Sequence, residues 1–444
     1  MKEKWKIKSG ITLIALIITI IVLLILAGVA LATLTGQGNI IGNAENAVGQ
    51  YNNSVIKEQQ LLNEIEKYFQ NYLEGGNPPE DPTDPPAPTP PVNEDGLATE
   101  NVTIKPDPNS DLQITIPAGF APAILATGTT QSGPGEDGSV VSIMSADQWN
   151  NITTEDIDKG IVIVDNAITY DNGQATGTVP DFNEYVWVPI TDSNNFKSTA
   201  WTTAYGYDAN GDWVNGTGVT HSIAITPTTN EEKQNKYWED YTTEEYTNMV
   251  ASVEHYKGFY IGRYEASNNG SSIAQSKRNQ TIWNNVSQTT AITACKNNTK
   301  TPNMHLIYGI EWDSTLNWLI ENATISSSTA GVKKTITIDD IQTNSSSWGN
   351  YDNSTGDAAT GKGTKRNTGY NESWKANNIY DLAGNVDEWT QEKYSTGTYR
   401  AARGGYCSND GELGPAALRV YSSESGTGID VRVPQQLFCS TGRW

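Results

Sequence analysis

The longest apolar run of the chain lies close to its start. From Ile11 to Leu34, 24 consecutive residues carry no charge, and the preceding Met1–Lys8 segment holds four lysines and one glutamate. At ~1.5 Å per residue, such a helix is longer than the ~30 Å hydrocarbon core of a bilayer. We therefore predict a membrane-spanning helix whose basic end stays in the cytoplasm. A cleaved secretory signal fits less well, because its apolar core would be shorter.

The apolar pattern continues as a single stripe beyond this segment. Its members recur every three or four residues, with one interruption at Glu58: Val48, Tyr51, Val55, Leu62, Ile65, Phe69 and Tyr72. This spacing favours a helix with one packing face, so we predict a membrane and stalk helix over residues 11–74. Eight prolines between Pro78 and Pro91 exclude helix and sheet and favour an extended polyproline conformation. Residues 75–96 are thus predicted to be a linker.

Short runs rich in β-branched and aromatic residues follow the linker, separated by Gly- and Asp-rich turns. They predict strands at Val102–Ile104, Leu112–Ile116, Val140–Ile143, Gly160–Val164, Tyr185–Val188 and Phe259–Ile261. Trp312, Leu316 and Leu319 recur at helical spacing. We predict a loop-rich α+β domain over residues 97–444, with an ion pair between Arg263 and Glu265 and with long surface loops over 191–250.

Two segments near the C-terminus carry the most specific pattern. Asn378–Trp389 reads NIYDLAGNVDEW, and Arg400–Tyr406 reads RAARGGY. In the first segment, Leu382, Val386 and Trp389 are three and four residues apart, which predicts one helical turn of apolar anchors. In the second, a strand ends in a glycine pair, which predicts that another backbone or side chain approaches closely there.

The first of these segments also offers oxygen ligands for a hard cation. Glu388 supplies a carboxylate. The bend before it presents the backbone carbonyls of Ala383, Gly384, Asn385 and Val386. Carbonyl and carboxylate oxygens are the ligands that Ca²⁺ takes in proteins. We predict a structural Ca²⁺ that orders the bend, with plain packing of the turn as the alternative.

The net charge and the number of cysteines argue against a nucleic-acid-binding protein and against a disulfide-stabilised fold. With 29 basic and 51 acidic residues the net charge is −22, so we predict no nucleic-acid partner. Three cysteines do not make a disulfide framework.

In their order and spacing, the two C-terminal segments resemble the formylglycine-generating-enzyme-like (sulfatase-modifying-factor) domain. Members of that family carry a LYDMAGNVWEW turn followed by RGGSW. The resemblance extends upstream to Glu184–Pro189 (EYVWVP), Gly258–Glu265 (GFYIGRYE) and the Thr301–Leu319 helix, and covers roughly the last 60% of the chain. It implies a C-type-lectin-like fold for the domain at 97–444.

The enzymes of this family depend on two closely spaced cysteines after the RGG motif, which hold copper(I). Here Cys407 follows Gly405, but Cys439 is 32 residues further along. A soft metal needs thiolates around one point, and redox chemistry needs an accessible thiolate. We therefore predict a protein that is not an enzyme and has no redox cofactor, and we keep a thiol oxidase as the alternative.

Small polar and aromatic residues dominate the C-terminal region 400–444. The candidate ligand-binding residues are Tyr406, Ser408, Asn409, Asp410, Val420, Tyr421, Ser422, Ser423 and Ser425. Such residues give adaptable hydrogen bonds and broad contact area at low entropic cost. The region resembles the variable tail of diversity-generating-retroelement target proteins, which implies a diversified binding face. A static binding loop stays open as the alternative.

Ser9-Gly10 followed by Ile11-Thr-Leu-Ile-Ala-Leu16 resembles the type IV prepilin signal, a glycine before FTLIEL. The resemblance implies a leader at residues 1–10 and possible pilus-subunit partners, although Ala15 stands where pilins have glutamate. We expect an adhesin- or receptor-type protein on the bacterial cell surface, held in the membrane by its N-terminal helix and binding an unknown protein or glycan. A minor pilin with a structural role is a further alternative.

Overall fold

The computed structural model describes residues 89–126, 138–166, 170–171, 174–175, 182–207, 213–220, 237–298, 304–320, 322–394 and 399–423. The chain divides into two compact units, Met1–Ala87 and Pro88–Trp444, and every described residue belongs to the second. The predicted leader 1–10, the membrane and stalk helix 11–74 and most of the linker 75–96 lie outside the described residues and stay predictions. Among the helices that the structure does describe, none has the length and apolar content needed to cross a membrane.

The last residues of the predicted linker belong to the folded unit. Val92 pairs with Ala98 in an antiparallel bridge. The amide of Thr99 donates to the carbonyl of Pro91 at 3.0 Å. The folded unit therefore includes residues before position 97.

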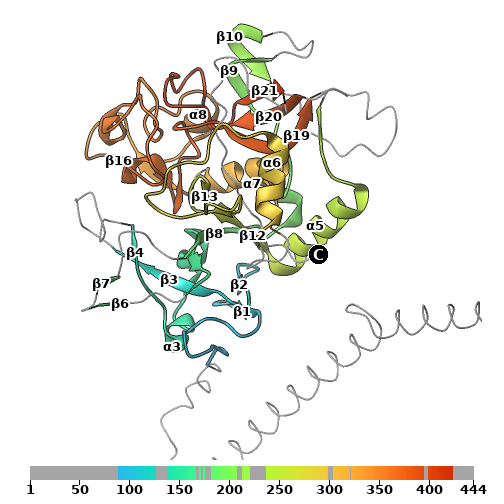
Figure 1. The fold of residues 1–444 in the computed structure, drawn as a ribbon, viewed down its shortest axis with the longest axis vertical. Helices are drawn as coiled ribbons and strands as arrows, with labels where there is room; N and C mark the ends of the chain where they lie inside the picture. Colours follow the sequence, from blue (N-terminus) through green and yellow to red (C-terminus); the bar gives the residue numbers. More distant parts are fainter. Residues whose placement is uncertain are drawn as a thin grey trace, which may run out of the picture. The chain divides into compact units, whose positions relative to one another are not determined.

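A five-stranded antiparallel sheet runs through the middle of the unit (Figure 1). Its order is β12 (Gly258–Gly262), β8 (Glu184–Pro189), β5 (Val162–Val164), β3 (Ala121–Leu125) and β4 (Val140–Ile143). All six residues of β8 are buried, because the side chains on its two faces pack into two different hydrophobic clusters. Val186 and Val188 enter one cluster, whereas Tyr185 and Trp187 enter the other. This is the two-residue alternation of a strand that is covered on both faces.

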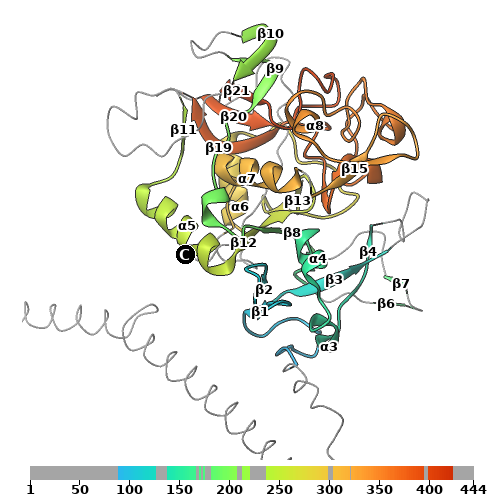
Figure 2. The same cartoon turned by 180° about the vertical axis from the view of Figure 1, so that it is seen from behind.

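A second, four-stranded antiparallel sheet carries the C-terminal motif. Its order is β11 (Tyr237–Glu239), β19 (Glu388–Tyr394), β20 (Tyr399–Arg403) and β21 (Arg419–Ser423). Helix α7 (Gly309–Leu319) contacts both β8 and β19 and so connects the two sheets (Figure 2). Every residue of α7 except Asn317 is buried. A helix buried all round is a core element rather than a surface one.

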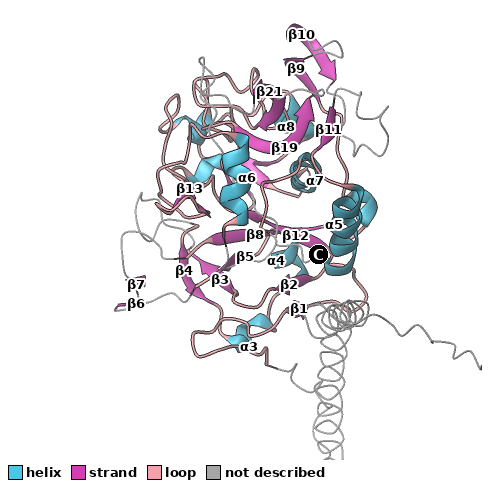
Figure 3. Cartoon of the chain, turned by 45° about the vertical axis from the view of Figure 1, so that its right-hand side comes forward, coloured by secondary structure: helices cyan, strands magenta, loops and turns pink. Residues whose placement is uncertain are grey.

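The other elements are short and are linked by turns (Figure 3). The helices are α3 (Ala146–Trp149), α4 (Thr154–Asp158), α5 (Thr243–Tyr256), α6 (Gln288–Lys296) and α8 (Ile338–Gln342), with 3-10 turns η1 (Ser193–Asn195), η3 (Gly356–Ala359) and η4 (Glu372–Trp374). The antiparallel pairs are β1 (Val102–Ile104) with β2 (Ile114–Ile116), β6 (Tyr170–Asp171) with β7 (Gln174–Ala175), β9 (Thr202–Tyr207) with β10 (Trp213–Thr220), β13 (Ser267–Asn268) with β14 (Ala274–Gln275), β15 (Thr324–Ser326) with β16 (Lys333–Thr335), and β17 (Lys375–Ala376) with β18 (Ile379–Tyr380). The domain is mixed α+β, with small antiparallel sheets and few helices in its described part.

The expectation of long surface loops over 191–250 was wrong in two places. Strands β9 and β10 form a hairpin, and Thr243–Tyr256 is the 14-residue helix α5. The amide of Glu245 donates to the hydroxyl of Thr242 at 3.1 Å, and the Glu245 carboxylate accepts from the amide of Thr242 at 2.7 Å. This reciprocal cap starts the helix, and Met249 and Val253, four residues apart, bury its inner face.

The predicted ion pair between Arg263 and Glu265 is also wrong. Strand β12 ends at Gly262, so the two residues no longer alternate as in a strand. Arg263 instead pairs with Glu184, at 2.5 Å between Nη1 and Oε2. Glu265 accepts a hydrogen bond from the Asn385 side chain at 2.5 Å.

The helical turn predicted around Leu382 does not form. Asp381, Gly384 and Asn385 have φ values of 60°, 74° and 63°, which lie in the left-handed region and interrupt a right-handed helix. Bends carry residues 382–387, and β19 begins at Glu388. Leu382, Val386 and Trp389 are nevertheless all buried.

The predicted close approach at the glycine pair is confirmed, and it gives a test of the fold. A Cβ added to Gly405 (φ +78°) would lie 2.1 Å from the carbonyl oxygen of Gly414, whereas one added to Gly270 (φ +87°) would meet nothing. Gly405→Ala should therefore lower the free energy of unfolding by roughly 2–5 kcal/mol, through strain plus a clash. Gly270→Ala should cost only about 1 kcal/mol, from strain alone. Urea denaturation of both variants measures the difference, and equal losses would contradict the close approach.

Candidate functional site

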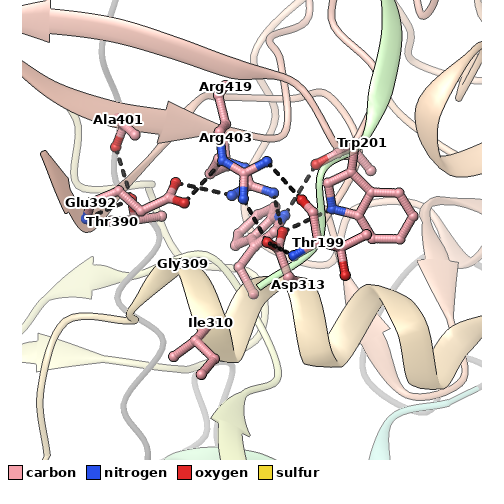
Figure 4. A network of polar contacts seen from close by, with 12 residues as sticks. Thr199, Trp201, Gly309, Ile310, Asp313, Thr390, Glu392, Ala401, Arg403 and Arg419 are labelled. Carbon is pink, nitrogen blue, oxygen red and sulfur yellow. Dashed lines mark hydrogen bonds and ion pairs between the residues drawn. The ribbon is translucent and has the colours of Figure 1, made fainter. Parts of the chain in front are cut away.

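Two arginines on neighbouring strands form the base of the candidate site. Arg403 at the end of β20 lies directly opposite Arg419 at the start of β21. Both side chains are fully buried and reach down to Asp313 on α7 (Figure 4). The distances are 2.6 Å from Arg403 Nη2 to Asp313 Oδ1 and 2.5 Å from Arg419 Nη2 to Asp313 Oδ2. One carboxylate thus joins the two strands to the central helix.

A second carboxylate completes the cluster. Glu392 on β19 accepts from Arg403 Nη1 at 3.0 Å and from Arg419 Nε at 2.9 Å. Asp313 also accepts from the indole of Trp201 and the amide of Thr199, both at 2.8 Å. Burial by itself would raise the pKa of Asp313, but Arg419 and Arg403 outweigh burial and lower it. We call Asp313, Glu392, Arg403 and Arg419 the arginine–carboxylate cluster.

A third carboxyl, that of Glu239 on β11, closes the cluster on the side of the α7 N-terminus. It accepts the amide hydrogens of Gly309 at 3.1 Å and Ile310 at 2.7 Å. Glu239 is paired with Glu392 across β11 and β19. Burial and the charge of Glu392 raise the pKa of Glu239 well above its ordinary value. Two guanidinium groups therefore face the carboxyl groups of Asp313 and Glu392, and the carboxyl group of Glu239 lies beside them.

The loop between β20 and β21 rests on this base. It begins with Gly404 and Gly405, both at positive φ. The amide of Cys407 donates to the Asn385 carbonyl at 3.1 Å, and the amide of Asp352 donates to the Asn409 carbonyl at 2.9 Å. The amide of Gly414 donates to the carbonyl of Asp410 at 3.0 Å. The loop over residues 406–414, which we call the RGG loop, is therefore fixed by backbone hydrogen bonds at both ends and in its middle.

The structure divides the predicted ligand-binding residues into two groups. In the RGG loop, Ser408 is exposed, and Tyr406, Asn409 and Asp410 are half-buried. On β21, Val420, Ser422 and Ser423 are half-buried. Ser422 and Ser423 pair with Arg400 and Tyr399, so they lie roughly 10–13 Å of strand away from the loop end of β20. Val420 pairs with Ala402 and lies beside that end. Ser425 lies outside the described residues.

Tyr421 does not lie on the outer face as a ligand contact would. Its side chain is only 7% exposed, and it shares a strand face with the buried Arg419, two residues away. This burial argues against the ligand contact expected for it. Val420 and Ser422 lie on the opposite face of β21 and remain candidates.

Three of the carbonyl oxygens predicted to hold Ca²⁺ already accept hydrogen bonds within the chain. The carbonyl of Ala383 accepts from Asn350, that of Gly384 from Val386 and that of Asn385 from Cys407, at 3.2, 2.8 and 3.1 Å. Within the described ranges, no group of three or more His, Cys, Asp or Glu side chains is arranged as a metal site. A bound ion would have to share the carbonyls with these hydrogen bonds. The structural Ca²⁺ stays a prediction.

The predicted metal ligand Glu388 lies in a buried acidic cluster with Glu265, Asp381 and Asp387. Burial, followed by the charge of Glu265, raises the pKa of Glu388 well above its ordinary value. Burial raises the pKa of Asp381 and that of Asp387 to about 7 each. Such a cluster needs protons or a cation to neutralise it, because an uncompensated buried charge is costly.

Sequence reasoning missed Asp313, Glu239 and Glu392 as members of the site. The available signal was chemical. Asp313 follows Trp312 in a segment with apolar residues at helical spacing, and a buried carboxylate is rare unless it is paired. Glu392 stands between Gln391 and Lys393 and gives no such signal. The arginine of an RGG motif requires such a partner, but the sequence does not say which acid supplies it.

Comparison with protein-family models and with curated proteins finds no match for this chain.

The acidic cluster predicts an unusual pH dependence of stability. Asp381 and Asp387 keep their protons up to a pH of about 7 in the folded chain, against an ordinary pKa of 3.8. The folded state then binds more protons than the unfolded state between these values, so the contribution of the two carboxyls is complete below pH 3.8 and is lost as the pH rises through 7. Chemical denaturation between pH 4 and 8 in chelator should show this loss, and Asp381→Asn should reduce it.

The same stability measurement, repeated with added Ca²⁺, tests the predicted metal site. If Ca²⁺ binds at Glu388, the added ion should restore stability at pH 7–8, where the carboxylates are ionised. Glu388→Ala should abolish that response. Identical melting with and without chelator would count against the metal.

Proposed function

We propose that the described domain is a C-type-lectin-like, formylglycine-generating-enzyme-like binding module whose RGG loop and outer β21 face contact a protein or glycan ligand. A single contrast carries this proposal. Arg403 and Arg419 are fully buried, whereas Ser408 between them is exposed. Buried charged residues thus flank a loop that exposes a small polar residue at the surface. That is the arrangement of a recognition surface on a rigid scaffold.

The fixed backbone of the RGG loop supports recognition. Residues 406–414 form hydrogen bonds to the segment over 345–354, including one from the amide of Gly411 to Asn353 Oδ1 at 2.8 Å. A loop that is ordered before binding loses less entropy when the ligand arrives. Its exposed side chains can then vary without changing the backbone, which suits a diversified tail.

Thiol oxidation has less support than binding. Cys407 is only 4% exposed, and Cys295 is completely buried. Oxidation of a substrate cysteine needs an accessible thiolate. Cys439 lies outside the described residues.

Display outside a bacterial cell is the second half of the proposal. It rests on the sequence of the first 96 residues, with their basic start, apolar run, amphipathic stripe and proline run. In this arrangement the N-terminal helix anchors the chain in the membrane or in a pilus. The proline-rich spacer then holds the binding module away from the surface.

Paired lysine substitutions test the binding face. The full-length chain, displayed on cells, is applied to arrays of glycans and of surface proteins. Ser408→Lys and Ser422→Lys should each lower binding to the recognised ligand by about tenfold, because a long charged side chain disrupts a fitted contact. Ser271→Lys makes the same change in an exposed turn of another hairpin and should leave binding unchanged.

Melting temperatures of all three variants should match that of the parent chain, since none of the sites is buried. Unaltered binding by both Ser408→Lys and Ser422→Lys would refute the proposed face. Turnover of a cysteine peptide by the full-length chain would favour the oxidase instead.

A further inference from the structure

A cavity of about 310 Å³ lies beside the last turns of α7, away from the RGG loop. Its walls come from Ser314, Asn317 and Trp318 on α7, from the end of α4, and from the chain that follows β8. Helices α4 and α7 and strand β8 can be followed in Figure 3. Ligand sites usually measure ~300–1,000 Å³, so this cavity suits a small ligand.

The walls of the cavity are held in place by hydrogen bonds. The indole of Trp318 donates to the carbonyl of Asp158 at 3.1 Å and so ties α7 to α4. The amide of Lys197 donates to the hydroxyl of Ser314 at 3.1 Å, and the Asn317 side chain donates to the Thr199 hydroxyl at 2.7 Å. Because both sides are fixed, the cavity is preorganised.

Several polar side chains at the cavity are available to a ligand. Among the described residues, the carboxylate of Asp158, the amide group of Asn195 and the ammonium group of Lys197 have no hydrogen-bond or ion-pair partner, apart from what a ligand or water supplies. Partial burial raises the pKa of Asp158. Thr191 and Asn322 also line the cavity, and the side-chain nitrogen of Asn322 donates to the carbonyl of Trp318 at 2.9 Å, which leaves its oxygen as an acceptor.

The charge of the cavity favours a neutral ligand. Asp158 and Lys197 contribute one charge of each sign. The cavity also adjoins the C-terminal turns of α7, where the helix dipole is negative and disfavours anions. The remaining polar groups are amides and hydroxyls, which both donate and accept hydrogen bonds. Leu112, Pro189 and Trp318 supply apolar surface.

We propose that this cavity binds a small neutral saccharide, one or two sugar rings in size. A sugar presents hydroxyls that match side-chain amides and hydroxyls, and its C–H faces pack on apolar surface. This site shares no residue with the RGG loop or β21. It is therefore independent of the function proposed above, and either one can fail alone.

Titration of the full-length chain with single sugars tests the site. The probes are glucose, galactose, mannose and N-acetylglucosamine, with glycine as a zwitterionic probe and inorganic phosphate as an anionic one. At least one sugar should bind with a dissociation constant of about 1 mM or tighter, measured by calorimetry. Asn195→Ala and Asp158→Asn should each weaken that binding by roughly five- to tenfold, the effect of losing a hydrogen bond.

The neighbouring Asn194 provides the matched control. Its side chain lies outside the cavity and donates to Asp192 at 2.8 Å, so Asn194→Ala should leave sugar affinity unchanged. Lys197→Gln serves as a further cavity variant if Asn195→Ala fails to fold. The proposal is overturned if no sugar binds, if glycine or phosphate binds in preference, or if sugar binding is unaffected by the cavity variants. Loss of sugar binding in Ser408→Lys would likewise overturn it, by assigning the sugar to the RGG loop.

Discussion

Two buried arginines, each bound by the same two carboxylates, fix the C-terminal half of this domain. Asp313 comes from the central helix and Glu392 from β19, while Arg403 and Arg419 come from two further strands. Removing charged groups from water is costly, and the attraction between them offsets that cost only with good geometry. The cluster meets this condition because all four side chains have several partners. It specifies how α7 and three strands pack together. It also fixes the two strand ends that the RGG loop connects.

The turn that precedes β19 is also closely packed, and two of its contacts require glycine. A Cβ on Gly384 would lie 2.2 Å from the carbonyl oxygen of Asn350, and one on Gly404 would lie 2.3 Å from Glu388 Oε2. The amide of Gly384 donates to the carbonyl of Gly404 at 2.8 Å. The two motifs found in the sequence are therefore in direct contact, and glycine allows this contact. The acidic cluster beneath them makes the region sensitive to protons or to a cation.

Much of the sheet could be predicted from the sequence, because its strands have apolar residues on successive positions or in alternation. Val140–Ile143 is a strand with the predicted bounds, and the predicted strand Tyr185–Val188 lies inside the longer strand Glu184–Pro189. Helix α5 was missed because its segment is rich in Thr and Glu and buries few apolar side chains. The Thr242–Glu245 capping box was the readable sign of it. The partners of the buried arginines could not be predicted, because they are distant in the chain. Glu184 is 79 residues from Arg263. Asp313 is 90 residues from Arg403 and 106 from Arg419.

These features support one account, in which a buried ionic cluster holds a polar loop in a single conformation for recognition. Amide hydrogen exchange of the full-length chain tests it most directly. The amides of Cys407, Asn409 and Gly414 donate to backbone carbonyls, whereas those of Gly270 and Ser271 donate only to exposed side-chain oxygens. The account predicts that the first three exchange at least ~10³-fold more slowly than the last two, as expected for a loop that opens only with its core. Exchange of the RGG loop as fast as that of Gly270 and Ser271 would contradict it.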